Sequence, residues 1–178
     1  MQKIIPKIEL LLLGAWLGSA CFFSFGVAPG AFAVLPSRDL AGAMVNRSLM
    51  IINIAGLAIG VVLLLTSLVQ RGDAKKAWMW VQRGLLIVMA AACAVGQFVI
   101  AFWMAYLRIQ MKGPIDDLAA NDPLRVQFNN LHQYSVWVLL TAMGASLLVF
   151  FVISRKAPSG SSKKGGAGGF ELPDDLKF

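Results

Sequence analysis

The chain has 178 residues, of which 58% are hydrophobic and 14% are charged, and its formal net charge is +7. This composition excludes an ordinary soluble globular domain, and the length leaves no room for a separate soluble enzyme domain. The basic residues stand at the ends of apolar segments and not in a stripe with stacking aromatic residues, so we do not expect a nucleic-acid partner. No catalytic motif is recognisable, so we expect a non-enzymatic protein without a cofactor.

Four long apolar runs occupy most of the chain, at residues 8–35, 44–68, 77–107 and 131–154. Each run exceeds the roughly 20 apolar residues that an α-helix needs to cross a bilayer. The sequence therefore predicts an all-α integral membrane protein in which residues 1–156 form one domain, a four-helix transmembrane bundle.

The distribution of Lys and Arg residues predicts how this bundle is oriented. Short loops on the cytoplasmic side of a membrane carry an excess of positive charge. We therefore expect both termini and the middle loop in the cytoplasm, and the short loops are compatible with a bacterial inner membrane. The cytoplasmic side would hold eleven basic residues (Lys3, Lys7, Arg71, Lys75, Lys76, Arg83, Arg155, Lys156, Lys163, Lys164 and Lys177) and the outer side five (Arg38, Arg47, Arg108, Lys112 and Arg125).

A cleavable signal peptide ending near residues 31–33 is the alternative interpretation of the first run. The run is too long for the apolar region of a signal peptide, so we interpret it as a membrane span.

Small residues recur at intervals of four along the first two runs. Glycines four residues apart share a helix face and let neighbouring backbones approach closely, which is how helices associate in lipid. The spacing predicts helix-packing surfaces within a compact bundle and leaves open a second copy of the chain as a partner. The residues concerned are Gly14, Gly18, Gly26, Gly30, Gly56 and Gly60.

Cys21 and Cys93 both lie inside predicted spans, and we interpret them as buried packing residues and not as a disulfide. The predicted orientation puts the two thiols at similar depths. A dithiolate metal site with Met89 or Met104 as a further soft ligand is the alternative.

Polar side chains inside the predicted spans are few. Asn53 and Gln97 are expected to form intramembrane hydrogen bonds between helices, with a ligand contact as the alternative. We expect no carboxylate within the spans, and coupled proton transport commonly uses one. An autonomous proton-coupled exporter is therefore disfavoured.

Several residues gather at the end of the bundle that is predicted to face outward. Pro29 lies near the end of the first run, where it is expected to bend or stop the helix. The third run reaches the same end at Arg108 and Met111. The segment Asn121-Asp122-Pro123 predicts the start of the fourth helix, with a capping side chain before a proline in the first helical position.

The fourth helix carries Arg125, Phe128, His132 and Ser135 at spacings of three or four residues, so these side chains share one face. His132 is the only histidine in the chain. It is interpreted either as an interfacial histidine bonded to a backbone carbonyl or as a group that binds a ligand or handles a proton.

At these positions the chain resembles a four-span family, the bacterial relatives of eukaryotic transmembrane protein 205, which form a domain of unknown function. The resemblance covers residues 8–154. It rests on Trp16-Leu17-Gly18, Phe22-Phe23, Ala28-Pro29-Gly30-Ala31-Phe32, Leu40-Ala41-Gly42, Arg108 with Met111, and Phe128-Asn129-Asn130-Leu131-His132-Gln133-Tyr134-Ser135.

The resemblance implies a shared cluster at the outer face and leaves the activity open, because the bacterial members have no agreed biochemical activity. The eukaryotic relative is linked with resistance to a platinum drug, which hints at metal or drug handling. Arg47 departs from the family pattern, in which an apolar or aromatic residue is expected, and this leaves open how the second helix meets the cluster. The implied cluster consists of Pro29, Phe32, Arg108, Met111, Phe128, His132 and Ser135.

Residues 157–178 differ in kind from the rest of the chain. Residues 157–169 are rich in Gly, Ser and Lys, a composition that cannot bury a core, so we expect a flexible, disordered cytoplasmic tail. Residues 170–178 mix apolar and acidic residues, and a short docking peptide on a flexible tether is the alternative.

Two kinds of function remain open beyond contact with the lipid bilayer. In the first, the protein is a non-enzymatic binding or accessory subunit that meets a membrane-protein partner, or another copy of itself, through its glycine faces and tail. In the second, it is a binding or transport module whose outward pocket receives a small ligand or a soft metal at His132 and Met111. The expected lack of a carboxylate in the spans favours the first.

Overall fold

The computed structural model describes residues 4–69, 76–111 and 113–156, and all the regular elements in these ranges are helices. Helices that are long and apolar enough to cross a membrane run over Ile5–Val34, Arg38–Leu68, Ala77–Met111 and Pro123–Arg155. For the described residues, the prediction of an all-α fold with four helices long and apolar enough to cross a membrane is therefore confirmed. The predicted disordered tail and its docking alternative, at residues 157–178, lie outside the described residues.

Two of the four spans are interrupted by a π-helical turn. The first span consists of α1 (Ile5–Phe22), the π turn η1 (Phe23–Val27) and α2 (Ala28–Val34), and the second is the single helix α3 (Arg38–Val69). The third consists of α4 (Lys76–Ala94), the π turn η2 (Val95–Ile100) and α5 (Ala101–Met111). A short 3-10 turn, η3 (Ile115–Asp117), leads to α6 (Pro123–Lys156), which forms the fourth span.

Two helices, α3 and α6, begin well before their apolar runs, and a polar side chain caps each of them. Ser37 Oγ accepts a hydrogen bond from the Leu40 backbone N–H at 3.3 Å, so α3 begins six residues before the second run. Asp122 Oδ1 accepts one from the Leu124 N–H at 2.8 Å, which confirms the predicted cap before Pro123.

Pro29 does not stop the first span, which corrects one expectation. The widened turn η1 comes immediately before it, and the Ala28 N–H bonds to the Phe23 carbonyl five residues back. Pro29 then falls in the first turn of α2, where a missing N–H is tolerated. The helix ends instead at Leu35, whose backbone is extended before Pro36.

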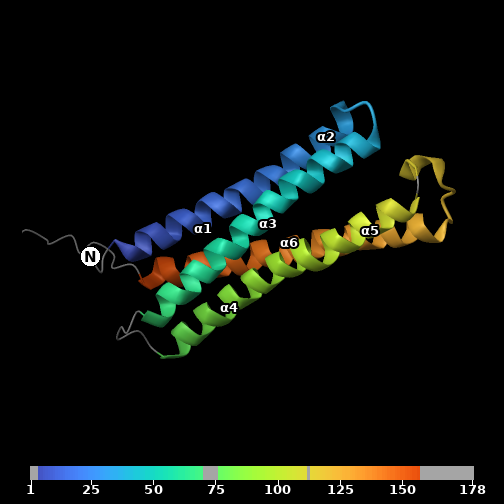
Figure 1. Cartoon of the computed structure of the whole chain (residues 1–178). Coiled ribbons are helices and arrows are strands. Elements are labelled where there is room, and N and C mark those ends of the chain that lie inside the picture. Colours follow the sequence, from blue (N-terminus) through green and yellow to red (C-terminus); the bar gives the residue numbers. More distant parts are fainter. Residues whose placement is uncertain (1–3, 70–75, 112, 157–178) are drawn as a thin grey trace, which may run out of the picture.

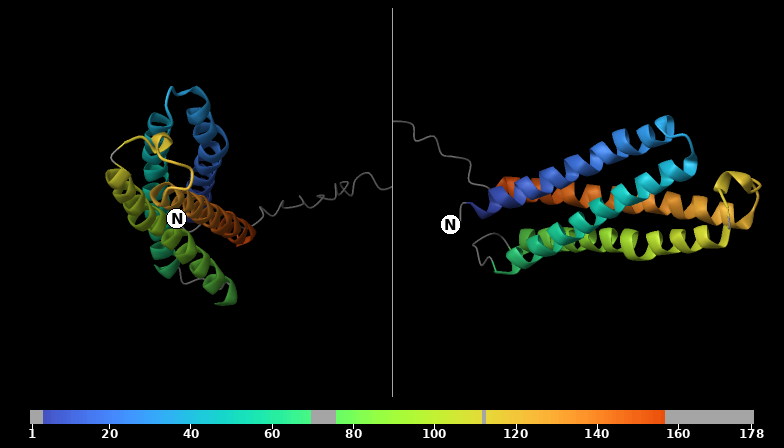
Figure 2. Two further views of the ribbon diagram at one scale, coloured as in Figure 1. Left: turned by 90° about the vertical axis from the view of Figure 1, so that its right-hand side faces the viewer. Right: turned by 45° about the horizontal axis from the view of Figure 1, so that its top comes forward.

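The four spans form a closed bundle in which each helix packs against two others. In order around the bundle, α1 packs against α3, α3 against α4, α4 against α6, and α6 against α1. The start of α1, the end of α3, the start of α4 and the end of α6 all lie at one end of the bundle (Figure 1). At the other end, α2 and the first turns of α3 diverge from α5 and the first turns of α6, as both Figure 1 and Figure 2 show.

A close contact in the middle of the bundle joins three helices around one glycine. The Trp16 indole lies against α3, and its Nε1 donates a hydrogen bond to the Ile52 carbonyl at 2.9 Å. A Cβ placed on Gly56 would stand 2.7 Å from both the indole and the Cys93 Sγ. Only a glycine admits the Trp side chain and the Cys side chain together at this point of α3.

The other predicted packing glycines divide into two groups. Gly60 meets Ala90 of α4, since a Cβ there would be 3.2 Å from the alanine methyl group, and Gly14 is in ordinary contact with Phe150. At Gly18 and Gly30 a Cβ would meet nothing within 4 Å, and at Gly26 it would meet only Phe22 of the same span. A side chain at these three positions would therefore find no other described helix among its nearest neighbours; Gly18 and Gly26 are exposed, and Gly30 is half-buried.

The expected hydrogen bonds of Asn53 and Gln97 are not present among the described residues. Asn53 is 4% exposed, and its amide lies against Gly96 of η2, where a Cβ would be 3.1 Å from the amide nitrogen. Gln97 is half-buried in the same π turn. Close packing against a glycine takes the place of the interhelical bond that we expected.

The outer surface of the bundle is apolar. Leu11, Phe25, Phe102 and Trp137, one or more from three of the spans, are among the large hydrophobic side chains that are exposed. A continuous apolar surface of this kind needs lipid or a protein partner to cover it. The architecture is that of a multi-pass membrane protein.

Replacing Gly56 tests whether the three-helix contact holds the bundle together. Gly56→Ala should lower the free energy of unfolding by about 1–3 kcal/mol, because the new methyl group must displace the rigid Trp16 indole. Gly18→Ala, in open space, should change it by less than about 1 kcal/mol. Thermal or dodecyl-sulfate unfolding in detergent micelles measures both, and equal effects of the two variants would contradict the assignment.

Candidate binding pocket

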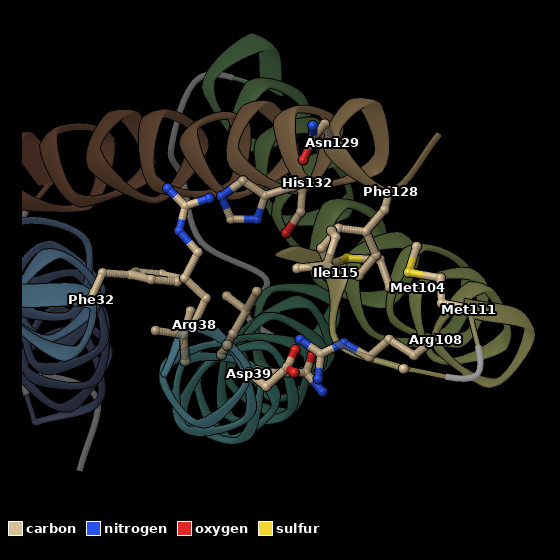
Figure 3. A pocket seen from close by; sticks show the side chains of 16 residues that line it. Phe32, Arg38, Asp39, Met104, Arg108, Met111, Ile115, Phe128, Asn129 and His132 are labelled. Carbon is tan, nitrogen blue, oxygen red and sulfur yellow. The ribbon is translucent and has the colours of Figure 1, made fainter. Parts of the chain in front are cut away.

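A cavity of about 630 Å³ occupies the end of the bundle at which the helices diverge (Figure 3). Helices α2, α3, α5 and α6 and the segment around η3 surround it, so all four spans contribute to one pocket. The lining residues are Phe32, Arg38, Asp39, Gly42, Val45, Asn46, Leu49, Met104, Arg108, Met111, Gly113, Ile115, Phe128, Asn129, His132 and Ser135.

The structure brings together six of the seven residues of the predicted outer cluster. Phe32, Arg108, Met111, Phe128, His132 and Ser135 all line the cavity. Pro29 does not, since it lies on an exposed part of α2. Arg125, on the same predicted face of α6, also stays outside and donates a hydrogen bond to the Leu118 carbonyl at 2.6 Å.

Helix α3 supplies a wall of the pocket that sequence reasoning missed. Arg38, Gly42, Val45 and Leu49 follow one another at spacings of three or four, so they share a face. This helical spacing could have indicated the wall from the sequence. It was not used because Arg38 and Gly42 precede the apolar run at residues 44–68 and Val45 stands at its start. Arg47, the departure from the family pattern, is exposed and does not line the cavity, so it does not disturb this wall.

Arg108 is fixed in the pocket by the two helices that face it. Its guanidinium carbon lies 5.4 Å from the centroid of the Phe128 ring, a cation–π contact from α5 to α6. Its Nη2 lies against the α3 backbone, where a Cβ on Gly42 would be only 2.7 Å away. Gly42 therefore leaves the space that the guanidinium occupies.

Other polar groups lie around this guanidinium. Figure 3 shows Arg108 reaching towards Asp39 at the start of α3, and His132 pointing from α6 in the direction of Arg38. Arg38 itself forms an exposed ion pair with Asp116, with Nη1 and Oδ1 3.3 Å apart. This pair connects the start of α3 to the η3 segment that borders the pocket.

His132 is exposed at the pocket and forms no hydrogen bond with the residues that the structure describes. The interpretation that it bonds a backbone carbonyl therefore finds no support among these residues. Its imidazole is accessible from the cavity and can donate or accept one hydrogen bond at each ring nitrogen.

The metal-binding potential of the described residues is small. They contain no group of three His, Cys, Asp or Glu side chains that could share a metal ion. Cys93 is buried against Gly56, and Cys21 is half-buried, both as free thiols. Met104, Met111 and His132 do line the same cavity, and they are the donors that a soft metal ion would use there.

The expectation of carboxylate-free spans is wrong, because Glu9 lies inside the first span. Glu9 is 4% exposed, and its Oε1 accepts a hydrogen bond from Thr66 Oγ1 of α3 at 2.9 Å. The Arg83 side chain of α4 donates to the Ser67 carbonyl at 2.7 Å in the same region. These contacts join three helices at the end opposite the pocket, so the argument drawn from missing carboxylates no longer holds.

A family model described as a domain of unknown function, DUF4149, matches residues 11–113. The chain belongs to this family. No curated protein and no solved structure matches it.

The DUF4149 match covers the helices from α1 to α5 and ends before α6. The matched range therefore includes Arg108 itself and Gly42 of α3, which leaves space for its guanidinium. The pocket residues Phe128, Asn129, His132 and Ser135 belong to α6 and lie beyond the matched range.

The contact between Glu9 and Thr66 gives a prediction for the closed end. Thr66→Val removes the hydroxyl that donates to Glu9 Oε1, so the free energy of unfolding should fall by about 1 kcal/mol. Thr141→Val is the matched control, because that exposed hydroxyl bonds only to the Trp137 carbonyl of its own helix. Unfolding in detergent micelles should show a loss for the first variant and none for the second.

Proposed function

We propose that this DUF4149 protein is a non-enzymatic membrane protein that binds a small molecule in the cavity between α2, α3, α5 and α6. The observation that carries the proposal is the convergence of all four spans on that cavity. Ligand pockets commonly measure about 300–1,000 Å³ and combine apolar walls with a few polar groups. This pocket combines Phe32, Val45 and Leu49 with Arg108 and His132.

The pocket belongs, in this proposal, to the outer side of a bacterial inner membrane, with both termini in the cytoplasm. The surplus of Lys and Arg residues at the end that carries the termini supports this orientation. The pocket would then collect its ligand from the space outside the membrane or from the outer leaflet.

Binding is preferred to proton-coupled transport because of where the ionisable groups lie. Glu9 supplies a carboxylate within a span, but it lies near the start of α1, the end of that span away from α2, and is bonded to Thr66. The described residues between the two ends are packed around Trp16 and Gly56. This arrangement supports a pocket that opens at one end and is closed beneath.

An accessory role is the second candidate, and one observation favours it. Gly18 and Gly30 meet no neighbouring helix, so the first span presents small residues outward. A transmembrane helix of another protein or of a second copy fits such a face. The proposed kinship with relatives of transmembrane protein 205 favours neither candidate, because those relatives have no agreed activity.

A tryptophan that fills the pocket tests binding directly. Asn129 and Asn130 are adjacent exposed residues of α6, but only Asn129 lines the cavity. Native mass spectrometry of protein purified in mild detergent should show a small-molecule adduct on the wild type and on Asn130→Trp, and none on Asn129→Trp. An adduct on all three chains, or on none, would contradict the proposal.

Elemental analysis of the same samples, with His132→Ala added, separates an organic ligand from a soft metal. We expect no stoichiometric metal in any of the samples. A metal that is present in the wild type and lost in His132→Ala would contradict an organic ligand. It would indicate a metal site formed by Met104, Met111 and His132.

Single cysteines test the proposed orientation. After Cys21 and Cys93 are replaced by Ala, a cysteine introduced at the exposed Asp117 should react with a membrane-impermeant maleimide in intact cells. A cysteine at Ser161 should react only after the cells are opened. The reverse pattern would overturn the orientation and leave the binding proposal standing.

A further inference from the structure

The proposed binding pocket contains a cation whose hydrogen-bond donors have no acceptor in the described chain. Arg108 forms no hydrogen bond or ion pair with the residues at 4–69, 76–111 and 113–156. By contrast, Arg38 donates to Asp116 and Arg125 donates to the Leu118 carbonyl. A guanidinium carries five N–H donors in one plane, so Arg108 can offer a forked pair of donors to a ligand.

The Arg108 side chain is held so that these donors stay inside the pocket. The Phe128 ring supports one side of the guanidinium at 5.4 Å, and the missing side chain of Gly42 makes room for Nη2. A long side chain that is held between two helices loses little further freedom when it binds a ligand. The geometry is that of a prepared anion contact.

The charges that line the pocket favour an anion with a single negative charge. Arg38 is already paired with Asp116, so Arg108 is the guanidinium that is left without an ion-pair partner among the described lining residues, and Asp39 contributes one negative charge. Asp39 would repel a second negative charge on the ligand and could accept a hydrogen bond from a hydroxyl group of the same head. Asn129 and Ser135 provide further polar groups on α6.

The remaining walls of the pocket suit a hydrocarbon chain. Val45, Leu49 and Met104 are apolar and lie on helices that also face lipid. Arg108 stands one turn before Met111, the last residue of the third span, so its charge lies near the depth at which lipid head groups begin. A ligand with its head at Arg108 could therefore extend its chain towards the membrane core.

We propose that the pocket binds an amphiphile with a singly charged oxyanion head, a phosphodiester or a carboxylate, placed at the Arg108 guanidinium with its hydrocarbon chain along Val45, Leu49 and Met104. This inference rests on the proposed function and names the class of its ligand. A bilayer phospholipid and a free fatty acid are the two sources of such a head.

The test uses the full chain, stripped of lipid in detergent, and ligands matched for their hydrocarbon chain. Oleate and monoolein carry the same acyl chain but differ in head charge, and phosphatidylglycerol represents the bilayer source. Native mass spectrometry should show one oleate or one phosphatidylglycerol bound per chain, and binding of monoolein at least about tenfold weaker, because a hydrogen bond to a charged group is lost. Inorganic phosphate alone should bind no better than monoolein.

Arg108→Gln should lower the affinity for the better-bound anionic amphiphile by about tenfold or more. Gly42→Ala should also weaken it, since the new methyl group displaces only the end of the Arg108 side chain and leaves the backbone in place. Arg47→Gln removes an equal charge from an exposed position on α3 outside the pocket and should leave the affinity unchanged. Melting temperatures without ligand establish that each variant is folded.

Three results would overturn the inference. If monoolein binds as tightly as the better bound of oleate and phosphatidylglycerol, the head charge is not recognised. If Arg108→Gln and Arg47→Gln lose equal affinity, the effect is a general attraction between charges and not a contact at Arg108. Inorganic phosphate that binds as tightly as the better bound of the two amphiphiles would show that the hydrocarbon chain is not needed. With any of these three results, a small-molecule adduct that is lost in Asn129→Trp would still support the proposed function. If no adduct is found on any chain, both the proposed function and this inference are contradicted.

Discussion

Helices in lipid are not driven together by the hydrophobic effect, so the bundle depends on contact close enough for packing and hydrogen bonds to act. The structure concentrates this contact at Gly56. The Trp16 indole, the Cys93 side chain and the α3 backbone meet there, and the indole N–H reaches the Ile52 carbonyl. A three-way junction fixes the distance between α1, α3 and α4, and the two ends of the bundle follow from what lies on either side of it.

On one side of the junction, polar side chains tie the helices together, as Glu9 does with Thr66 and Arg83 with the Ser67 carbonyl. On the other side, the first and third spans each contain a π turn, η1 and η2. A π turn inserts one extra residue, so the side chains beyond it are rotated relative to those before it. Phe32 and Arg108 both lie beyond such a turn and face the cavity. Closure at one end and divergence at the other thus have separate local causes.

Hydropathy and spacing were sufficient for the spans and for the α6 side of the pocket, because those signals are local. The α3 side was missed since Arg38 and Asp39 precede the apolar run, and a capping contact from Ser37 extends the helix over them. Glu9 stands at the second position of the first apolar run, so the sequence itself places a carboxylate there, whereas its partner Thr66, 57 residues away, is known only from the fold. For the same reason, spacing could not distinguish Gly56, which packs, from Gly18, which does not: both have the same pattern, and only the rotation of each helix decides.

The position of the two ionisable groups decides how the pocket should be understood. A carboxylate and a guanidinium on one continuous path would favour movement of charge through the bundle. Here Glu9 lies near the start of α1 and Arg108 near the end of α5, and these two helix ends stand at opposite ends of the bundle (Figure 1). The packed junction of Trp16, Gly56 and Cys93 lies between them. The guanidinium can exchange a ligand with the open end and with the surrounding lipid, while the carboxylate stabilises the closed end. Such a division of roles suits a protein that holds an amphiphile at the membrane surface better than one that carries it across.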